Sequence, residues 1–198
     1  MRQSYFLPIY LVLYVIAAFF WRSYVVWKKT GINPVVFKGT DSAHDFIGTV
    51  SKLIFAVVLL VVMVYSVLPG VYAYLMPVPW LQHPWIRSTG VILLIASLVW
   101  IVLAQGQMGE SWRIGIDTDN KTKLVQTGVY RVSRNPIFLG MMVTLFGLFL
   151  VIPNAVTLLI FVLIVVLINI QVRLEEEYLK GSHGEEYVRY QRTVGRWI

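Results

Sequence analysis

The sequence lacks cysteine and contains few charged residues. Without cysteine in its 198 residues, the chain forms no disulfide, thiolate nucleophile, iron–sulfur cluster or cysteine-ligated zinc site. Charged residues make up 14% of the chain, against roughly a quarter in a typical soluble domain, and 58% of the residues are hydrophobic. A soluble core of this size cannot absorb so much apolar sequence. We therefore predict that the lipid bilayer surrounds most of the chain.

The basic residues lie in short segments between apolar runs. The formal net charge is +7, and this placement is typical of a membrane protein that faces anionic lipid. No long polar segment combines a basic stripe with interleaved aromatic residues, so we predict no nucleic-acid partner. His44, His83 and His183 are scattered without metal-ligand spacing, so we assign them no role and predict no metal site.

The apolar runs predict an all-α, polytopic membrane fold with about five transmembrane helices. The first helix covers residues 3–27 and is interrupted only by Arg22, which can snorkel to the interface. The second begins at an N-cap, Asp41 or Ser42, and runs to about residue 76, with a kink or an end at Pro69-Gly70. An interfacial turn over residues 76–85 leads to the third helix, residues 88–109.

Residues 135–172 form a stretch of 38 residues without a charge, too long for one helix across a core of about 30 Å. Pro153-Asn154 lies near its middle, so we predict a hairpin of two tightly paired helices, the fourth and fifth. Gly140, Thr144 and Gly147 form a small-residue face for close approach within the hairpin or in a dimer; the oligomeric state stays open. Residues 185–197 predict an interfacial amphipathic helix.

Charge placement also predicts the orientation. With five spans and the N-terminus outside, the inner segments hold 15 of the 17 Lys and Arg residues. We therefore expect a cytoplasmic C-terminus and a site at the cytoplasmic interface. The chain divides into residues 1–107, with the first three helices, and residues 108–198, with a polar loop, the hairpin and the tail.

The hairpin brings two polar clusters to one membrane level. Asn135 opens the fourth helix, and Glu175-Glu176 closes the fifth. Free backbone N–H groups at a helix start bind anions, and paired carboxylates bind cations, so an amino-acid moiety fits both. Simpler interpretations stay open at this point: Asn135 as a plain N-cap, the glutamates as a helix leaving the membrane, and Tyr130 as a belt aromatic.

Motifs in the second half of the chain occur in the order of a known family. The pattern comprises Gly128, Tyr130, Arg134, Pro136, Phe138 and Gly140, then Glu175-Glu176, then Gly184-Glu185 and Tyr187. It resembles the isoprenylcysteine carboxyl methyltransferases and the related phospholipid methyltransferases, small polytopic enzymes that use S-adenosyl-L-methionine. The resemblance covers roughly residues 108–197.

The resemblance implies roles for particular residues. The implied cofactor site comprises Lys123, Leu124, Val125, Tyr130, Asn135, Pro136, Ile137, Phe138 and Glu175. The implied catalytic residues are Glu175, Glu176 and Arg173. The implied substrate-binding residues are Trp112, Arg113, Arg134 and Gln171.

Two positions depart from the family pattern. The family usually has His-Pro-x-Tyr where this chain has Asn135, Pro136, Ile137 and Phe138. Asparagine still forms hydrogen bonds but transfers no proton. The carboxyl methyltransferases also have an arginine at the position of Gln171, so this chain holds a different group or uses Arg113, Arg134 or Arg173 instead.

The resemblance implies methyl transfer from S-adenosyl-L-methionine to a lipid-like or prenylated acceptor. Four alternatives stay open: a phospholipid amine or quinone-like acceptor, a small thiol acceptor, an NADPH-dependent membrane reductase, and a non-catalytic membrane scaffold.

Overall fold

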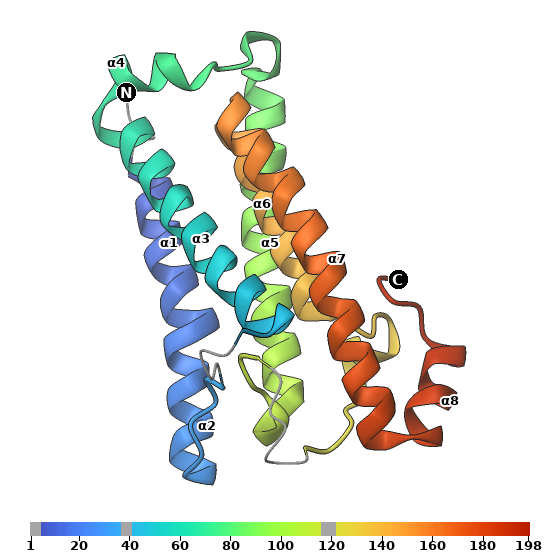
Figure 1. The fold of residues 1–198 in the computed structure, drawn as a ribbon. Coiled ribbons are helices and arrows are strands. Elements are labelled where there is room, and N and C mark those ends of the chain that lie inside the picture. Colours follow the sequence, from blue (N-terminus) through green and yellow to red (C-terminus); the bar gives the residue numbers. More distant parts are fainter. Residues whose placement is uncertain (1–4, 37–40, 116–121) are drawn as a thin grey trace.

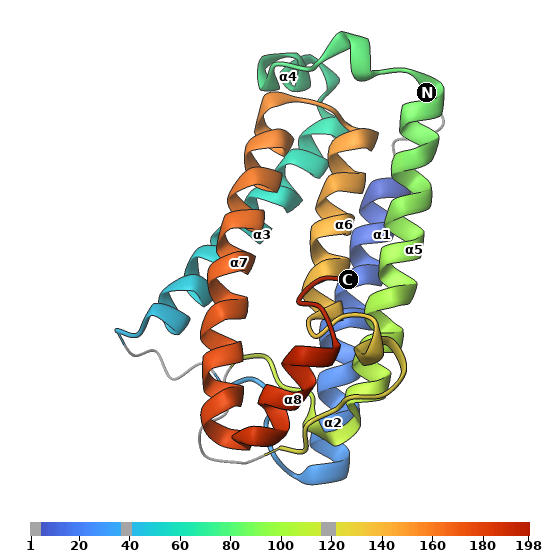
Figure 2. The ribbon, with the colours of Figure 1, turned by 90° about the vertical axis from the view of Figure 1, so that its right-hand side faces the viewer.

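The computed structural model describes residues 5–36, 41–115 and 122–198, and in these ranges the chain forms helices and no strand. The long helices group into five rods, which stand side by side (Figures 1 and 2). The first rod joins α1 (Phe6–Val15), a π-helical segment (Ile16–Trp21) and α2 (Arg22–Thr30). The other rods are α3 (Ala43–Val67), α5 (Pro84–Met108), α6 (Pro136–Val151) and α7 (Ala155–His183). The short helices α4 (Pro69–Tyr72) and α8 (Glu185–Thr193) lie at opposite ends of the bundle (Figure 1).

Four of the rods are long and apolar enough to cross a membrane: Phe6–Thr30, Ala43–Val67, Pro84–Ser111 and Ala155–His183. The helix α6 is apolar but has 16 residues, which gives it a length of about 24 Å. It stands beside α7, so the described residues hold four candidate spans and one shorter apolar helix. The predicted all-α polytopic fold is confirmed, and the chain is an integral membrane protein.

The helix boundaries follow local sequence signals. The Ser42 hydroxyl caps α3 by accepting the Asp45 N–H at 3.2 Å, as predicted. The second rod ends at Val67, directly before the predicted kink or end at Pro69-Gly70, because Leu68 precedes Pro69 and leaves the helical conformation at φ −125°. The chain from Pro69 onward crosses one end of the bundle as α4 and short turns (Figure 1).

The predicted hairpin is present and turns between α6 and α7. Asn154 starts α7 with a reciprocal cap: its side chain accepts the Thr157 N–H at 3.0 Å, and the Thr157 hydroxyl accepts the Asn154 N–H at 3.3 Å. The crossing segment is tied to this turn, since the Val78 N–H donates to the Pro153 carbonyl at 2.9 Å. The turn and the segment after α4 therefore form one end of the molecule.

The small-residue face of α6 packs against α5, and this corrects the predicted close pairing within the hairpin or in a dimer. A Cβ at Gly140 would lie 2.5 Å from Ile101, and one at Gly147 would lie 3.0 Å from the Gly90 carbonyl. The Thr144 hydroxyl lies 2.8 Å from the Ser97 hydroxyl on α5. The closest helix pair is therefore α5 with α6, and α7 packs less closely on α6.

This contact predicts a position-specific effect of a single methyl group. A Cβ at Gly90 would lie 2.8 Å from the Gly147 carbonyl oxygen, whereas one at Gly106 on the same helix meets nothing within 4 Å. We expect Gly90→Ala to cost about 1–3 kcal/mol of folding free energy through overpacking. The thermal unfolding midpoint in detergent should fall accordingly. Gly106→Ala should leave the midpoint equal or higher, because alanine favours a helix. Equal shifts in both variants would contradict the packing described.

Candidate active site

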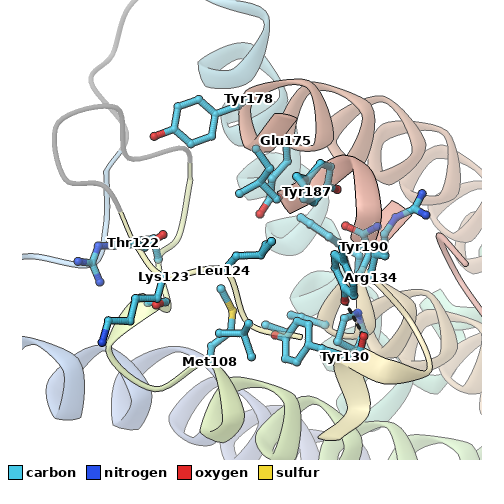
Figure 3. A pocket seen from close by; sticks show the side chains of 18 of the residues that line it. Met108, Thr122, Lys123, Leu124, Tyr130, Arg134, Glu175, Tyr178, Tyr187 and Tyr190 are labelled. Carbon is cyan, nitrogen blue, oxygen red and sulfur yellow. Dashed lines mark hydrogen bonds between the residues drawn. The ribbon is translucent and has the colours of Figure 1, made fainter. Parts of the chain in front are cut away.

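A pocket opens at the end of the bundle where α8 lies (Figure 3). Its walls come from the end of α5, the segment before α6, the first turn of α6, the last turns of α7, and α8. In the described part of the chain it is lined by Met108, Ser111, Arg113, Gly115, Thr122, Lys123, Leu124, Val125, Tyr130, Arg134, Asn135, Pro136, Ile137, Phe138, Glu175, Tyr178, Leu179, Tyr187 and Tyr190.

All nine positions predicted for the cofactor lie in this wall. They are Lys123, Leu124, Val125, Tyr130, Asn135, Pro136, Ile137, Phe138 and Glu175. The hairpin explains this convergence, since it returns α7 to the level at which α6 begins (Figure 2). The structure thus joins segments about 40 residues apart into one concave surface, and the cofactor role of these residues stays a prediction.

Glu175 is the acidic residue of the pocket wall. Its carboxylate is turned toward Leu124, whereas the Lys123 side chain runs away from Glu175 (Figure 3). Glu175 is half-buried, and among the described residues it forms neither a hydrogen bond nor an ion pair. A half-buried carboxylate without a partner is costly unless a cationic or hydrogen-bonding ligand approaches it. The described wall therefore presents one carboxyl group to whatever the pocket binds.

Glu176 faces away from the pocket and holds the C-terminal tail. Its side chain is 5% exposed and accepts Arg134 Nη2 at 3.1 Å and Arg196 Nη2 at 2.7 Å. The Asn135 side-chain amide also donates to Glu176, at 3.1 Å. The carboxylate is thus fully engaged and lies outside the wall of the pocket. Glu176 therefore does not line the pocket, and its predicted catalytic role stays a prediction.

Two predictions about the helix ends need correction. Asn135 stands at the N-cap position of α6, but its side chain makes no capping bond and reaches Glu176 instead. Pro136 follows it and lacks an N–H, which reduces the need for a cap. Glu175 does not close the fifth helix, because α7 continues for two more turns, to His183. The glutamates therefore lie within α7.

The predicted interfacial helix forms as α8 but turns its tyrosines inward. Tyr187 and Tyr190 are buried, and the Tyr190 hydroxyl donates to the Tyr130 carbonyl (Figure 3). Burial raises the pKa of Tyr190 to about 12 and also raises the pKa of Tyr187. Both phenols are therefore neutral at neutral pH and form part of the pocket wall.

The tail after α8 folds back onto the start of α6. The Arg134 N–H donates to the Gly195 carbonyl at 3.1 Å, and the Asn135 side chain reaches the Arg196 carbonyl at 3.3 Å. The hydrogen bond to Glu176 raises the pKa of the Arg196 guanidinium. The ion pair at Glu176 therefore fastens the C-terminal tail beside the pocket.

The predicted substrate-binding residues separate into two groups. Arg113 and Arg134 line the pocket, while Trp112 is buried beside it and Gln171 lies one turn before Glu175. Arg173, which the sequence also placed among the catalytic residues, is exposed and donates to the Asn169 carbonyl of its own helix at 2.6 Å. Arg173 is therefore not part of the pocket wall.

Sequence reasoning missed several contributors to this end of the molecule. Tyr178 and Leu179 line the pocket, and their positions three and four residues after Glu175 place them on one helix face, which was a usable signal. His44 is different, because its ring nitrogen lies 2.9 Å from the Gln171 side-chain amide across 127 residues of sequence. No spacing rule connects the two, so the pair was invisible in the sequence.

The Gly-x-Tyr element has a steric reason. Gly128 has φ +62°, and a Cβ there would collide with the Gln107 side chain of α5. The same Gln107 accepts the Val129 N–H at 2.7 Å, and the short turn that follows buries Tyr130. The glycine therefore lets the segment dock closely enough to bring Tyr130 into the pocket wall.

Comparison with known proteins decides the family. The sequence pattern of the phospholipid methyltransferase family matches residues 85–186. The chain belongs to this family. The match begins in α5, ends in α8 and includes both helices of the hairpin, so the family core holds most of the pocket wall. The resemblance inferred from the motifs is confirmed.

The curated relatives that are similar to this chain are named for the same activity. The chain is 29% identical over 116 residues to protein-S-isoprenylcysteine O-methyltransferase B of Arabidopsis thaliana, covering 57% of this chain and 59% of that protein. It is 31% identical over 109 residues to protein-S-isoprenylcysteine O-methyltransferase of Saccharomyces cerevisiae, covering 54% of this chain and 46% of the relative. The chain thus spans about half the length of these relatives.

Proposed function

We propose that the chain is a membrane methyltransferase that binds S-adenosyl-L-methionine in this pocket and methylates a lipid-like acceptor. One observation carries the proposal: the nine positions of the family's cofactor pattern converge on one cavity around the carboxylate of Glu175, which has no partner among the described residues. The names of the relatives support the acceptor class. The excess of Lys and Arg at this end supports a cytoplasmic pocket and an outside N-terminus.

The chemistry of the wall fits this cofactor. S-adenosyl-L-methionine carries an ammonium, a sulfonium, a carboxylate and an adenine ring. Glu175 supplies a negative charge for a cationic group, and the apolar side chains of Ile137 and Phe138 supply a surface for a ring. The first-turn amides of α6 have no carbonyl partner within the helix. These groups suit a carboxylate.

The residues of the chain need only orient the reactants and exclude water. S-adenosyl-L-methionine supplies an already activated methyl group when bound, so positioning provides most of the rate. Tyr187 and Tyr190 close the cavity on the α8 side, and the Glu176 ion pairs hold that wall in place. Glu175 attracts the cationic end of the ligand and is the one acidic group in the described wall that can accept a proton.

The acceptor that we propose is a prenylated cysteine carboxylate. Such an acceptor needs no general base, which agrees with asparagine at position 135 in place of the family histidine. Its carboxylate needs a cationic or hydrogen-bonding partner, and Arg113 of the wall is positioned for that role. A phospholipid amine is the second candidate, because Gln171 replaces the arginine of the carboxyl methyltransferases and Glu175 can take a proton from an amine.

A methyl-transfer screen tests this proposal. Purified protein in lipid–detergent micelles is incubated with methyl-labelled S-adenosyl-L-methionine and, in parallel, a farnesylated cysteine, phosphatidylethanolamine or a small thiol. We expect base-labile label in the farnesylated cysteine, as a methyl ester requires. Base-stable label in phosphatidylethanolamine would select the second candidate. If no methyl group is transferred, oxidation of added NADPH would indicate a reductase. Absence of both methyl transfer and NADPH oxidation would indicate a scaffold.

A further inference from the structure

A second cavity, of about 720 Å³, lies at the opposite end of the bundle and is called the outer cavity below. It is bounded by the last turns of α3, by α4, by the first turns of α5 and by the end of α6, at the end of the molecule away from α8 (Figures 1 and 2). Along α5, 21 residues separate Arg87 from Met108 of the first pocket, which corresponds to about 32 Å. A ligand in this outer cavity therefore cannot take part in methyl transfer at Glu175.

Arg87 is the charged group of the outer cavity. The sequence has no Asp or Glu between residues 46 and 109, nor between residues 135 and 172, so the helices that form this cavity carry no carboxylate near it. Among the described residues, the side-chain hydrogen bond of Arg87 goes from Nη2 to the Tyr65 hydroxyl, at 3.0 Å. A guanidinium has five N–H donors, so Tyr65 leaves most of this group available to an anion.

The remaining wall divides into a polar and an apolar part. Tyr65 and Tyr72 stand edge to face with ring centroids 5.1 Å apart, and Ser88 follows Arg87 on α5. One turn further into the membrane, Val91 and Ile92 continue the wall as apolar side chains, and Ile92 is 65% exposed on the bundle surface. The cavity thus has a polar rim that contains one guanidinium, and an apolar floor that reaches the exposed Ile92 on the bundle surface.

We propose that this outer cavity binds one phospholipid molecule, with its phosphate at Arg87 and an acyl chain along Val91 and Ile92. Arginine pairs with phosphate in charge-assisted, often bidentate hydrogen bonds. The first turn of a transmembrane helix lies at the level of the lipid headgroups. The apolar floor favours a lipid over free phosphate, which would leave Val91 and Ile92 without a partner. The ligand fills the space between α3 and the α5–α6 pair at this end.

Native mass spectrometry of the purified protein tests the proposal. Protein in a mild detergent is supplemented with dioleoyl phosphatidylglycerol, and the number of retained lipids and the thermal midpoint are measured against lipid concentration. Parallel samples receive dioleoylglycerol, which lacks the phosphate, or inorganic phosphate, which lacks the chains. We expect one phosphatidylglycerol to be retained and to raise the midpoint saturably, with little effect of the two partial ligands.

Variants place the effect at this cavity. Arg87→Gln should weaken retention about tenfold, as loss of a charge-assisted pair predicts, and Arg87→Lys should restore part of it. Ile92→Trp keeps the charge of Arg87 and blocks the apolar floor at an exposed position, so it should also weaken lipid retention. This variant tests the proposal if Arg87→Gln fails to fold. Arg192→Gln, at an exposed position of α8, is the matched control for net charge and should retain lipid like the wild type.

Three results would overturn the proposal. The first is equal lipid retention by the wild type, Arg87→Gln and Ile92→Trp, which means that the bilayer is held non-specifically. The second is an equal response to dioleoylglycerol, which would show that the cavity does not recognise the phosphate. The third is an equal response to inorganic phosphate, which would show that the cavity does not recognise the acyl chains. None of these measurements depends on methyl transfer, so the outcome is separate from that of the proposed function.

Discussion

Replacing Glu175 by glutamine should lower methyl transfer by a factor on the order of a hundred or more. Glutamine keeps the size of the side chain but removes the negative charge that the pocket offers to a cationic ligand. Because Glu175 forms no ion pair or hydrogen bond among the described residues, the fold does not depend on its charge. The thermal midpoint should therefore stay close to that of the wild type.

Single-turnover and steady-state assays with labelled cofactor measure this effect. Glu177→Gln is the matched control, since Glu177 lies two residues further along α7 and is exposed. We expect the control to keep wild-type turnover and Glu175→Gln to lose both cofactor affinity and turnover. Wild-type affinity and turnover in Glu175→Gln would remove Glu175 from the mechanism. A loss of the same size in Glu177→Gln would mean that general helix charge is responsible.

Glu176→Ala is expected to have the opposite profile, a large loss of stability. Removing this carboxylate leaves the guanidinium of Arg134, with a side chain 9% exposed, without its ion pair, and an uncompensated buried charge costs about 3–5 kcal/mol. The Arg196 side chain is 33% exposed, so water screens its part of the loss. We expect a total near the lower end of that range, together with release of the C-terminal tail.

Thermal unfolding and limited proteolysis measure the two consequences. Glu177→Ala changes an exposed glutamate on the same helix and should leave both readouts unchanged. The double variant Glu176→Ala with Arg196→Ala should cost less than the sum of the two single variants, because the residues share one contact. Additive losses, or a tail that stays resistant to protease in Glu176→Ala, would show that the ion pairs do not fasten the tail.

Much of the architecture followed from the sequence because lipid imposes simple rules. Long uncharged runs predicted the spanning rods, and the uncharged stretch with Pro153-Asn154 at its middle predicted the hairpin, since no single helix of that length fits a bilayer. The partner of the small-residue face was not predictable. Gly140 and Gly147 indicate a close approach, but several neighbouring helices can supply the opposing backbone, and α5 does so.

The sequence indicated which residues form the candidate site but not which way their side chains point. Glu175 and Glu176 form one motif in the sequence, yet neighbouring helix positions point about 100° apart, so one faces the pocket and the other faces the tail. The return of Arg196 to Asn135 spans 61 residues and leaves no periodic signal. The same holds for His44 and Gln171. Contacts made by a chain end or across the whole bundle need the structure.

The binding of S-adenosylhomocysteine tests the central claim most directly, because it needs no knowledge of the acceptor. Calorimetric titration of this compound, the product that remains when S-adenosyl-L-methionine has given up its methyl group, into the purified wild type should show saturable binding at one site per chain. Leu124→Trp, which fills the middle of the pocket (Figure 3), should abolish that binding while the thermal midpoint in detergent is retained. Absence of binding to a folded wild-type protein, or undiminished binding to folded Leu124→Trp, would contradict the assignment of this pocket to the cofactor.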